Sequence, residues 1–438
     1  MKRVFSLALA ALLLAGCTAA PTDSSASFSA VTPETSTAQE AESTAATPAP
    51  AAVLRPLWLG DEKAYYMDEM VTGELIRYRV ADLVNHVADV PCDVEGCAHD
   101  SESCPAVFRR GECDRVFVLD DDTLVAFTNN QFPETEDSQV VLLDRDCQNR
   151  RVVATIPNSC FLSMMGGDSF SSPYTDEQSL YCFGYTNASN GESALFRIEL
   201  ENGTVTNLLE NAPAQGLQFL GTLENLFVFS QSDVTYPEPT GDLTADALAA
   251  PTGTTTHWLF DPYTGEWKVF QTYSSGEWNL DLLDIRIVDG QYYVVDRTAG
   301  ALYTVDPTTG EKREITNQLP TSDLNDYSAH YWVAAKLNDW LVFDDLSVII
   351  NADTGEVRQR AYLPDNYWNG SSHQPNIYLN LGDTLLVDCR YEPYTRTIIG
   401  TDGTPYTVDV EHEYLGLIST EDFLNGVPNY TEVGEYTT

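Results

Sequence analysis

The stretch His257–Phe270, HWLFDPYTGEWKVF, holds two short apolar segments on either side of the turn DPYTG. Asp261 can accept hydrogen bonds from the backbone N–H groups that follow it, and Gly265 can adopt the positive φ that closes such a turn. Similar stretches recur as ALYTVDPTTGEKREI at 301–315 and VIINADTGEVRQRA at 348–361. In each, Val, Ile, Leu, Tyr or Phe alternates with polar residues, so each predicts a β-hairpin.

A second type of hairpin alternates with the first along the chain. It joins two apolar segments through a short turn rich in Asp, Asn or Gly, as in LGTLENLFVF at 220–229 and IVDGQYYVV at 287–295. The seven turns of this type centre near Asp61, Asp121, Glu177, Glu224, Gly290, Asn338 and Gly382. One hairpin of each type makes a four-stranded unit, and the chain holds seven such units.

The predicted fold is therefore all-β, a β-propeller of seven four-stranded blades, because radial repetition of small sheets hides their edges. The units differ in length, and the shortest approach the length of known blades. The alternatives are a large β-sandwich or two smaller β domains, and a ring of six or eight blades. No long stretch shows the 3.6-residue periodicity of an amphipathic helix.

Strand order within a blade assigns the loops to faces. The tight turns join the first strand to the second and the third to the fourth, so they share one face. The other face receives the second-to-third loops and the connections between blades, which here are long and irregular. These segments are 91–113, 128–139, 230–256, 317–330, 362–376 and 391–413. Long loops on a rigid scaffold commonly carry function, so we expect a binding surface on this face.

The N-terminus has the pattern of a secretion signal. Lys2 and Arg3 precede the apolar stretch Val4–Leu14, which is too short to span a bilayer as an anchor. The stretch ends in Leu14-Ala15-Gly16-Cys17. A small-small-Cys ending is typical of the bacterial lipobox, whose Cys is lipid-modified, so we expect Cys17 to carry acyl chains that bind the membrane. The alternative is an ordinary signal peptide with an incidental Cys.

Residues 18–53 consist mostly of Ala, Ser, Thr and Pro, without Lys or Arg. Such a segment buries too little apolar surface to offset the entropy of ordering, so it predicts a disordered tether. The predicted organisation is a signal peptide over 1–17, a linker over 18–53 and a propeller over 54–438. The protein is expected outside the cytoplasm, on the cell membrane.

The net charge of the chain restricts the classes of molecule that it can bind. The chain of 438 residues has 23 Lys and Arg against 66 Asp and Glu, a net charge of −43. This balance excludes a conventional nucleic-acid binder and adhesion to anionic lipid through a basic patch. It suits an acidic, soluble exported domain and predicts a partner surface that is neutral or basic, or reached through divalent cations.

The cysteines suggest a cross-linked or metal-bound loop. Nine are present, and four cluster in PCDVEGCAHDSESCPAVFRRGEC as Cys92, Cys97, Cys104 and Cys113. Outside the cytoplasm an even number of remaining cysteines favours disulfides, whose pairing the sequence leaves open. The alternative is a structural zinc site in which His99 joins three of the thiols, although the spacing differs from that of a zinc finger. Acidic runs also suggest calcium, but they lack the EF-hand pattern, and no other cofactor is indicated.

Aromatic residues in the predicted loops suggest a ligand face. Tyr367, Trp368 and His373 lie among Asn, Ser and Gly, and 391–394 contributes a second group, Tyr391, Glu392 and Tyr394. Aromatic rings beside amides and carboxylates stack on sugar rings or anchor peptides. The alternative is local packing beneath a long loop.

Catalytic signatures are missing from the sequence. It contains no Gly-x-Ser-x-Gly elbow, His-Glu-x-x-His pair, phosphate-binding loop or dinucleotide fingerprint. A pair of dispersed carboxylates could still perform glycoside chemistry, but the sequence does not select the pair. A solute-binding protein of an importer would need two α/β lobes and is disfavoured.

Taken with the lipobox and the tether, the repeated strand pairs resemble those of propeller-domain surface lipoproteins of Gram-positive Clostridia. The segment Cys92-x4-Cys97-x-His99-x4-Cys104-Pro105-Ala106 resembles a recurrent element of that group, and DPYTG and DPTTG resemble turns of quinoprotein-like propellers. The resemblance implies a fold and a location, and only lipidation of Cys17 carries over. We expect a monomeric binding or scaffold module for an envelope protein or glycan, with a surface glycosidase or lyase as the alternative.

Overall fold

The computed structural model describes residues 53–437 apart from short gaps. These gaps are 72–74, 110–114, 121, 129–136, 158, 162–172, 187–191, 239–250, 322–330, 344–345, 365, 369–370 and 400–403. Ala51–Thr438 forms one compact unit by itself. No helix within the described ranges is long and apolar enough to cross a membrane.

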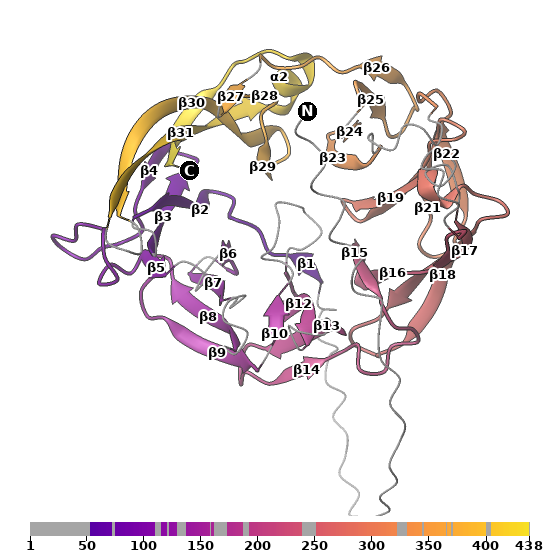
Figure 1. Ribbon diagram of the computed structural model, residues 1–438, viewed down its shortest axis with the longest axis horizontal. Helices are drawn as coiled ribbons and strands as arrows, with labels where there is room; N and C mark the ends of the chain where they lie inside the picture. Colours follow the sequence, from indigo (N-terminus) through magenta and orange to yellow (C-terminus); the bar gives the residue numbers. More distant parts are fainter. Residues whose placement is uncertain are drawn as a thin grey trace, which may run out of the picture. The chain divides into compact units, whose positions relative to one another are not determined.

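The unit is a ring of seven four-stranded antiparallel blades, which confirms the predicted fold (Figure 1). Blade 1 contains β2 (Lys63–Met70), β3 (Leu75–Asp82), β4 (Val87–Asp89) and β5 (Val107–Arg109). Blade 2 contains β6 (Arg115–Val118), β7 (Thr123–Thr128), β8 (Ser138–Asp144) and β9 (Arg151–Ile156). Blade 3 contains β11 (Tyr174–Thr175), β12 (Ser179–Thr186), β13 (Glu192–Glu199) and β14 (Val205–Asn207). The sheet of blade 3 also includes β1 (Arg55–Pro56) and β10 (Ser159–Phe161).

The remaining blades are more regular. Blade 4 contains β15 (Gln218–Leu223), β16 (Leu226–Thr235), β17 (Thr252–Phe260) and β18 (Trp267–Ser274). Blade 5 contains β19 (Leu283–Val288), β20 (Gln291–Asp296), β21 (Ala301–Val305) and β22 (Lys312–Thr316). Blade 6 contains β23 (Val333–Leu337), β24 (Trp340–Phe343), β25 (Val348–Asn351) and β26 (Val357–Gln359). Blade 7 contains β29 (Ile377–Asn380), β30 (Thr384–Ile399), β31 (Pro405–Ser419) and β32 (Thr431–Thr437). A hairpin of β27 (Asn366–Trp368) and β28 (Ser371–His373) precedes it, and the short helices are η3 (Leu280–Leu282) and α2 (Thr420–Asn425).

The turns form as their residues predict. In DPYTG, the Asp261 carboxylate accepts hydrogen bonds from the backbone N–H groups of Tyr263 and Thr264 at 2.8 and 3.2 Å, and Gly265 has φ +74°. The tight turns between first and second strands use left-handed residues, including Glu224 at φ +53° and Asn338 at φ +54°. Positive φ in two-residue turns matches the twist of the strands that they join.

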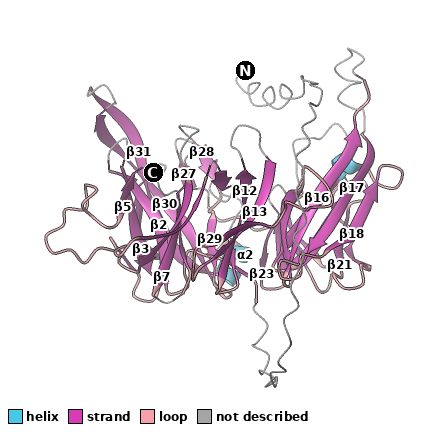
Figure 2. Cartoon of the chain, turned by 90° about the horizontal axis from the view of Figure 1, so that it is seen from below, coloured by secondary structure: helices cyan, strands magenta, loops and turns pink. Residues whose placement is uncertain are grey.

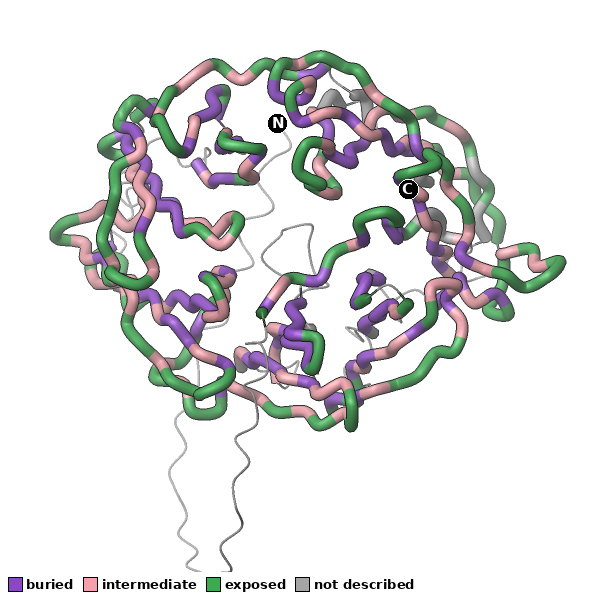
Figure 3. The backbone as a smooth tube through the Cα atoms, turned by 180° about the vertical axis from the view of Figure 1, so that it is seen from behind, coloured by how far each residue is buried: buried purple, intermediate pink, exposed green. Residues whose placement is uncertain are grey.

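The core consists of seven apolar clusters, one between each pair of adjacent blades in the described residues. In β20, Tyr292 and Val294 pack toward blade 4, while Tyr293 and Val295 pack toward blade 6. Alternate side chains of one strand therefore fill different cores, and Figure 3 shows buried positions along the strands and exposed ones at the turns. Because both faces of each blade are covered, the strands are more continuously apolar than a half-exposed strand would be.

The N-terminal segment differs from its prediction. The hairpin with its turn near Asp61 was expected to supply the first two strands of blade 1. Tyr65 does donate its backbone N–H to Leu59 at 3.0 Å, but the strand pairs formed before Lys63 are with other blades. Arg55 and Pro56 pair with β11 of blade 3, and Trp58 bridges Val118 of blade 2. Burial of two leucines explains the change. Leu54 packs between blades 3 and 4, and Leu57 packs between blades 2 and 3.

Blade 7 closes on blade 1 by side-chain packing. It is built from residues 377–437 alone, so no strand of the described N-terminal region completes it. Leu386 and Leu415 of blade 7 pack against Ala64 and Ala81 of blade 1. The contact is close at Gly434, where an added Cβ would lie 2.3 Å from the Cβ of Ala88.

Two predicted loops have a different structure. Within segment 391–413, which was expected to be irregular, 391–399 and 405–413 belong to β30 and β31, and 362–376 contains the β27–β28 hairpin. Segment 91–113 was expected to connect blades, but its described part leaves the outer edge of blade 1 and returns to the same sheet at β5. There, β4 and β5 both pair with β3, β4 along its C-terminal half and β5 along its N-terminal half.

Candidate functional site

The hairpin formed by β30 and β31 is the largest in the described part of the ring. These strands have 16 and 15 residues, whereas the corresponding strands of blade 6, β24 and β25, have four each. The inner strand β29 pairs with β30 only as far as Val387, and the outer strand β32 pairs with β31 only from His412 onward. Figure 2 shows the remainder projecting from the blade.

The structure brings together the two predicted aromatic groups. Strand β27, which contains Tyr367 and Trp368, lies beside β30, which contains Tyr391, Glu392 and Tyr394. His373 ends β28, the partner of β27. For Tyr367, Trp368 and His373 the structure describes the backbone alone. Both groups belong to the face that carries the second-to-third loops, as the strand order predicts.

One face of the projecting hairpin carries interlocked aromatic and charged side chains. The register places Arg390 opposite Tyr414 and Glu392 opposite His412. The Tyr394 and His412 rings stack with centroids 3.9 Å apart and planes at 16°. The Arg390 guanidinium lies 3.5 Å from the Tyr414 ring centroid. These contacts hold the rings in fixed orientations and leave them partly exposed.

Glu392 is held on the same face by two donors. The Tyr414 hydroxyl donates to its carboxylate at 3.0 Å and the Arg390 guanidinium donates at 3.1 Å. The hydrogen bond from Tyr414, followed by that from Arg390, lowers the pKa of Glu392. Arg390 also reaches Glu432 of β32 at 3.3 Å. Glu392 therefore presents a fixed, ionised carboxylate at the surface, ready to accept a hydrogen bond or pair with a cation.

The opposite face of the hairpin base contains two buried carboxylates. Asp388 is fully buried and Glu413 is 3% exposed. The Tyr391 hydroxyl donates to Asp388 at 2.6 Å, and the Tyr378 hydroxyl donates to Glu413. Asn376 donates to Asp388 through its backbone N–H and its side-chain amide. Burial is the largest cause of the raised pKa of both tyrosines, and the neighbouring carboxylates add to it.

This network corrects the role expected of Tyr391. The sequence placed it on the ligand face beside Tyr394, but its hydroxyl bonds to Asp388 at the base of the hairpin. Asp388 and Glu413 were not singled out among the many acids. Their sequence signal was their position. Asp388 lies in the apolar strand segment LLVDC and Glu413 lies in HEYLGLI, each at a position whose side chain points into the protein. Buried carboxylates need donors, so this network of five residues anchors the projecting strands to blade 7.

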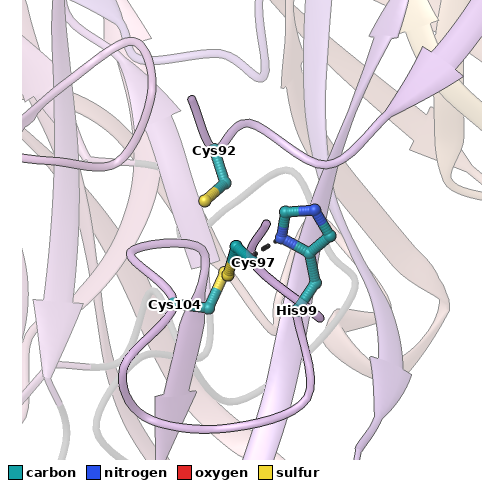
Figure 4. A group of neighbouring side chains, drawn as sticks. All are labelled: Cys92, Cys97, His99 and Cys104. Carbon is teal, nitrogen blue, oxygen red and sulfur yellow. Dashed lines mark hydrogen bonds between the residues drawn. The ribbon is translucent and has the colours of Figure 1, made fainter. Parts of the chain in front are cut away.

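The predicted cysteine cluster lies on the outer rim of blade 1. Cys92, Cys97, His99 and Cys104 place one ligand atom each within 4.8 Å of all the others, and theirs is the only such group in the described ranges (Figure 4). The His99 Nδ1 lies 3.3 Å from the Cys104 sulfur. Burial raises the pKa of Cys104 to about 12, whereas a backbone hydrogen bond from His99 is the main cause of the lowered pKa of Cys97.

None of the other cysteines with described side chains joins this group. Cys147 and Cys182 are buried and Cys389 is half-buried in blade 7, and Cys92, Cys97, Cys104, Cys182 and Cys389 are free thiols. Cys17 and Cys113 lie outside the described residues, and Cys160 is described only in its backbone. The acidic runs proposed for calcium place Asp120 and Asp122 in an exposed turn, with the other members outside the described ranges.

The architecture places the protein in the class of seven-bladed β-propellers. Comparisons with known proteins identify no family for the chain within that class. No protein-family model matches the chain. No curated protein sequence matches it. Among solved structures, similarity extends to the β-propeller domain of the Trilobed protease from Pyrococcus furiosus, at 8% identity and a TM-score of 0.40, covering 84% of this chain and 99% of that one.

Other propellers give similar figures. An oligogalacturonate lyase in complex with manganese is 15% identical with a TM-score of 0.39, covering 81% of this chain and 89% of that one. TolB from Acinetobacter baumannii is 11% identical with a TM-score of 0.34, covering 86% and 79%. Likeness at this level concerns the fold, and no activity is transferred from these proteins.

Proposed function

We propose that the protein is a lipid-anchored extracytoplasmic binding or scaffold module that holds an envelope protein or glycan on the projecting β30–β31 hairpin. The observation that carries this proposal is the length of that hairpin. Blade closure needs only the parts of β30 and β31 that pair with β29 and β32. The remainder contributes little to the core, so its ordered aromatic and charged surface is best explained by contact with a partner.

The side chains on the hairpin indicate how a partner is held. The stacked Tyr394 and His412 rings offer a flat, partly exposed surface of low conformational freedom, which suits a sugar ring or an apolar side chain. Glu392, fixed beside them, accepts hydrogen bonds from sugar hydroxyls or pairs with a basic side chain. A neutral or basic partner also fits the net charge of −43.

Membrane attachment is the second part of the proposal. The lipobox Leu14-Ala15-Gly16-Cys17 and the Ala/Ser/Thr/Pro segment after it support a lipid at Cys17 with a tether that lets the propeller reach its partner. Cys17→Ala is expected to release the protein from the membrane fraction into the soluble fraction. Retention of the Cys17→Ala variant in the membrane would contradict lipid anchoring.

The binding experiment uses the 51–438 chain as bait against envelope extracts and a glycan array. Tyr394→Ala removes the stack, and a second variant replaces 393–411 by a two-residue turn, which keeps Tyr391 and its hydrogen bond to Asp388. We expect each to lower partner affinity at least about tenfold, as a contact of roughly 1.4 kcal/mol or more requires. Shortening the β16–β17 hairpin by removing 233–254 is the matched control and should leave binding unchanged.

Two results would contradict this proposal. Equal binding by the bait and both blade 7 variants would move the site elsewhere on the ring. Release of reducing sugar from a polysaccharide panel by the 51–438 chain would instead support the glycosidase or lyase that the sequence left as the alternative. The buried Asp388 and Glu413 do not favour that reading, because tyrosine hydroxyls engage both carboxylates.

A further inference from the structure

The cysteine–histidine cluster closes an excursion in the edge strand of blade 1. Strand β4 ends at Asp89, the chain leaves the sheet, and β5 resumes pairing with β3 at Val107. The excursion lies over an apolar cluster that includes Cys104, Ala106 and Phe108. It has no helix or strand of its own, so its shape depends on turns and on the four clustered side chains.

Local backbone geometry directs these side chains inward. Gly96 and His99 have positive φ, at +72° and +55°, on either side of Cys97. Backbone hydrogen bonds from Cys97 to Val94 at 3.1 Å and from Cys104 to Ser101 at 2.9 Å close the two turns. A left-handed conformation at a histidine costs of the order of 1 kcal/mol or more and is held by its surroundings, often at functional sites.

The distances fit a tetrahedral zinc ion. With Zn–S of about 2.3 Å and Zn–N of about 2.0 Å, ligand atoms at the corners lie roughly 3.5 to 3.8 Å apart. The His99 Nδ1 and Cys104 Sγ are already 3.3 Å apart, and no pair of ligand atoms exceeds 4.8 Å. In Figure 4 the sulfur atoms and this ring nitrogen point toward one space, so only a small contraction is needed.

A disulfide explains the cluster less well. A single S–S bond would use two of the three thiols and leave the third beside an imidazole without a role. Zinc uses all four groups, and three thiols within 4.8 Å of one another and of a histidine nitrogen form a recognised Cys3His ligand set. The segment 92–104 also contains four acidic residues and no Lys or Arg, which favours a cation.

We propose that Cys92, Cys97, His99 and Cys104 form a Zn²⁺ site that fastens the excursion and holds β5 in register with β3. All four corners of the tetrahedron are protein ligands, so no position remains for substrate, and the site is structural. Each thiol releases its proton to solvent as it binds the metal. Bound zinc also protects the three thiols from oxidation outside the cytoplasm, where unpaired cysteines are otherwise vulnerable.

The test measures metal and thiols in the 51–438 chain, which forms a compact unit by itself. The protein is purified without added reductant, its zinc is measured by mass spectrometry, and cobalt is then exchanged into the site. We expect about one zinc per chain and, with cobalt, the intense charge-transfer absorption of three thiolates. Amide exchange in β5 should quicken when a chelator removes the metal, because the excursion loses its fastening.

Variants locate the site. His99→Asn and Cys97→Ser should each weaken zinc affinity by more than about 100-fold, the upper end of losses seen for outer-shell partners. Cys97→Ser should also reduce the cobalt charge-transfer intensity by about a third, since one thiolate of three is lost. Cys389→Ser is the matched control, because Cys389 is also half-buried and free but lies in blade 7, and it should retain the zinc.

The outcomes separate the alternatives. A disulfide among Cys92, Cys97 and Cys104, shown by peptide mass mapping of metal-free protein, would overturn the proposal. So would a reduced, folded chain that takes up no Zn²⁺ or Co²⁺, with folding judged from its circular dichroism. Neither result bears on the blade 7 hairpin, whose binding is measured separately.

Discussion

Replacing Gly434 by alanine tests how the propeller ring is closed. Gly434 lies in β32 of blade 7, and an added Cβ would lie 2.3 Å from the Cβ of Ala88 in β4 and 3.3 Å from the Tyr66 hydroxyl. Carbon atoms in contact lie about 3.5 to 4.0 Å apart, so blades 7 and 1 must separate by roughly 1 Å or more. Overpacking of this kind costs about 1–3 kcal/mol of unfolding free energy.

A second substitution, Ala88→Gly, should restore part of the stability lost in Gly434→Ala. Ala88→Gly removes the atom that the new Cβ would meet, at a cost of about 0.5–1 kcal/mol for glycine in a strand. If the clash causes the loss, the double variant should be more stable than the sum of the single changes predicts, by about 1 kcal/mol or more. The free energies come from urea unfolding followed by circular dichroism, with equal m-values as a check on the comparison.

The control is Gly276→Ala, since Gly276 has open space around its Cα and no positive φ. It should change stability by less than about 0.5 kcal/mol. The reasoning fails if Gly434→Ala is as harmless as Gly276→Ala. It also fails if the losses of Gly434→Ala and Ala88→Gly simply add, because the two positions would then not be in contact.

Three further changes probe buried groups. Arg297→Ala should cost about 3–5 kcal/mol, because it leaves the buried Asp284, 3.1 Å from the guanidinium, without its counter-ion. His257 is buried and its pKa is lowered to about 3 by desolvation, so its contribution to stability is complete above pH ~6.5 and lost as the pH falls toward 3. His257→Gln should remove up to about 1.4 kcal/mol per pH unit of that acid dependence. Leu57→Ala should cost about 2–5 kcal/mol, whereas Val53→Ala, at a side chain 68% exposed, should cost almost nothing.

Urea unfolding across pH measures all three, each with its own control. Arg109→Ala breaks an exposed ion pair with Glu102 and should cost less than about 1 kcal/mol, so an equal loss at Arg297 and Arg109 would contradict the burial argument. His86→Asn changes an exposed histidine, and a slope change as large as that of His257→Gln would refute the assignment. A harmless Leu57→Ala would mean that the N-terminal segment does not bind the inner strands.

The hairpins were predictable because their signals are local. Asp261 and Gly265 lie within five residues of one another, and their hydrogen bonds and φ values need no distant partner. The strands were visible as short apolar runs because both faces of a blade are buried, as at Tyr292 and Tyr293. Seven repeats of these local signals give the ring.

The candidate binding surface was only partly predictable. The sequence pointed to Tyr394 and Glu392, but it treated 391–413 as a loop, because strands exposed on both faces lack the apolar alternation that marks buried ones. Among 66 acids, Asp388 and Glu413 were marked only by their positions within apolar strands. Their burial depends on Tyr378 and Asn376 from a different strand and connection.

The sequence by itself determined the repeat, the turn chemistry, the acidic charge and the spacing of the four candidate zinc ligands, since each depends on neighbours along the chain. Only the tertiary structure decided where distant segments meet. Leu54 donates its backbone N–H to Asn225 across 171 residues, and Gly434 meets Ala88 at the ring closure. The physical reason is that such contacts depend on how neighbouring blades pack against each other. Composition and periodicity do not specify which distant residue a given side chain will meet.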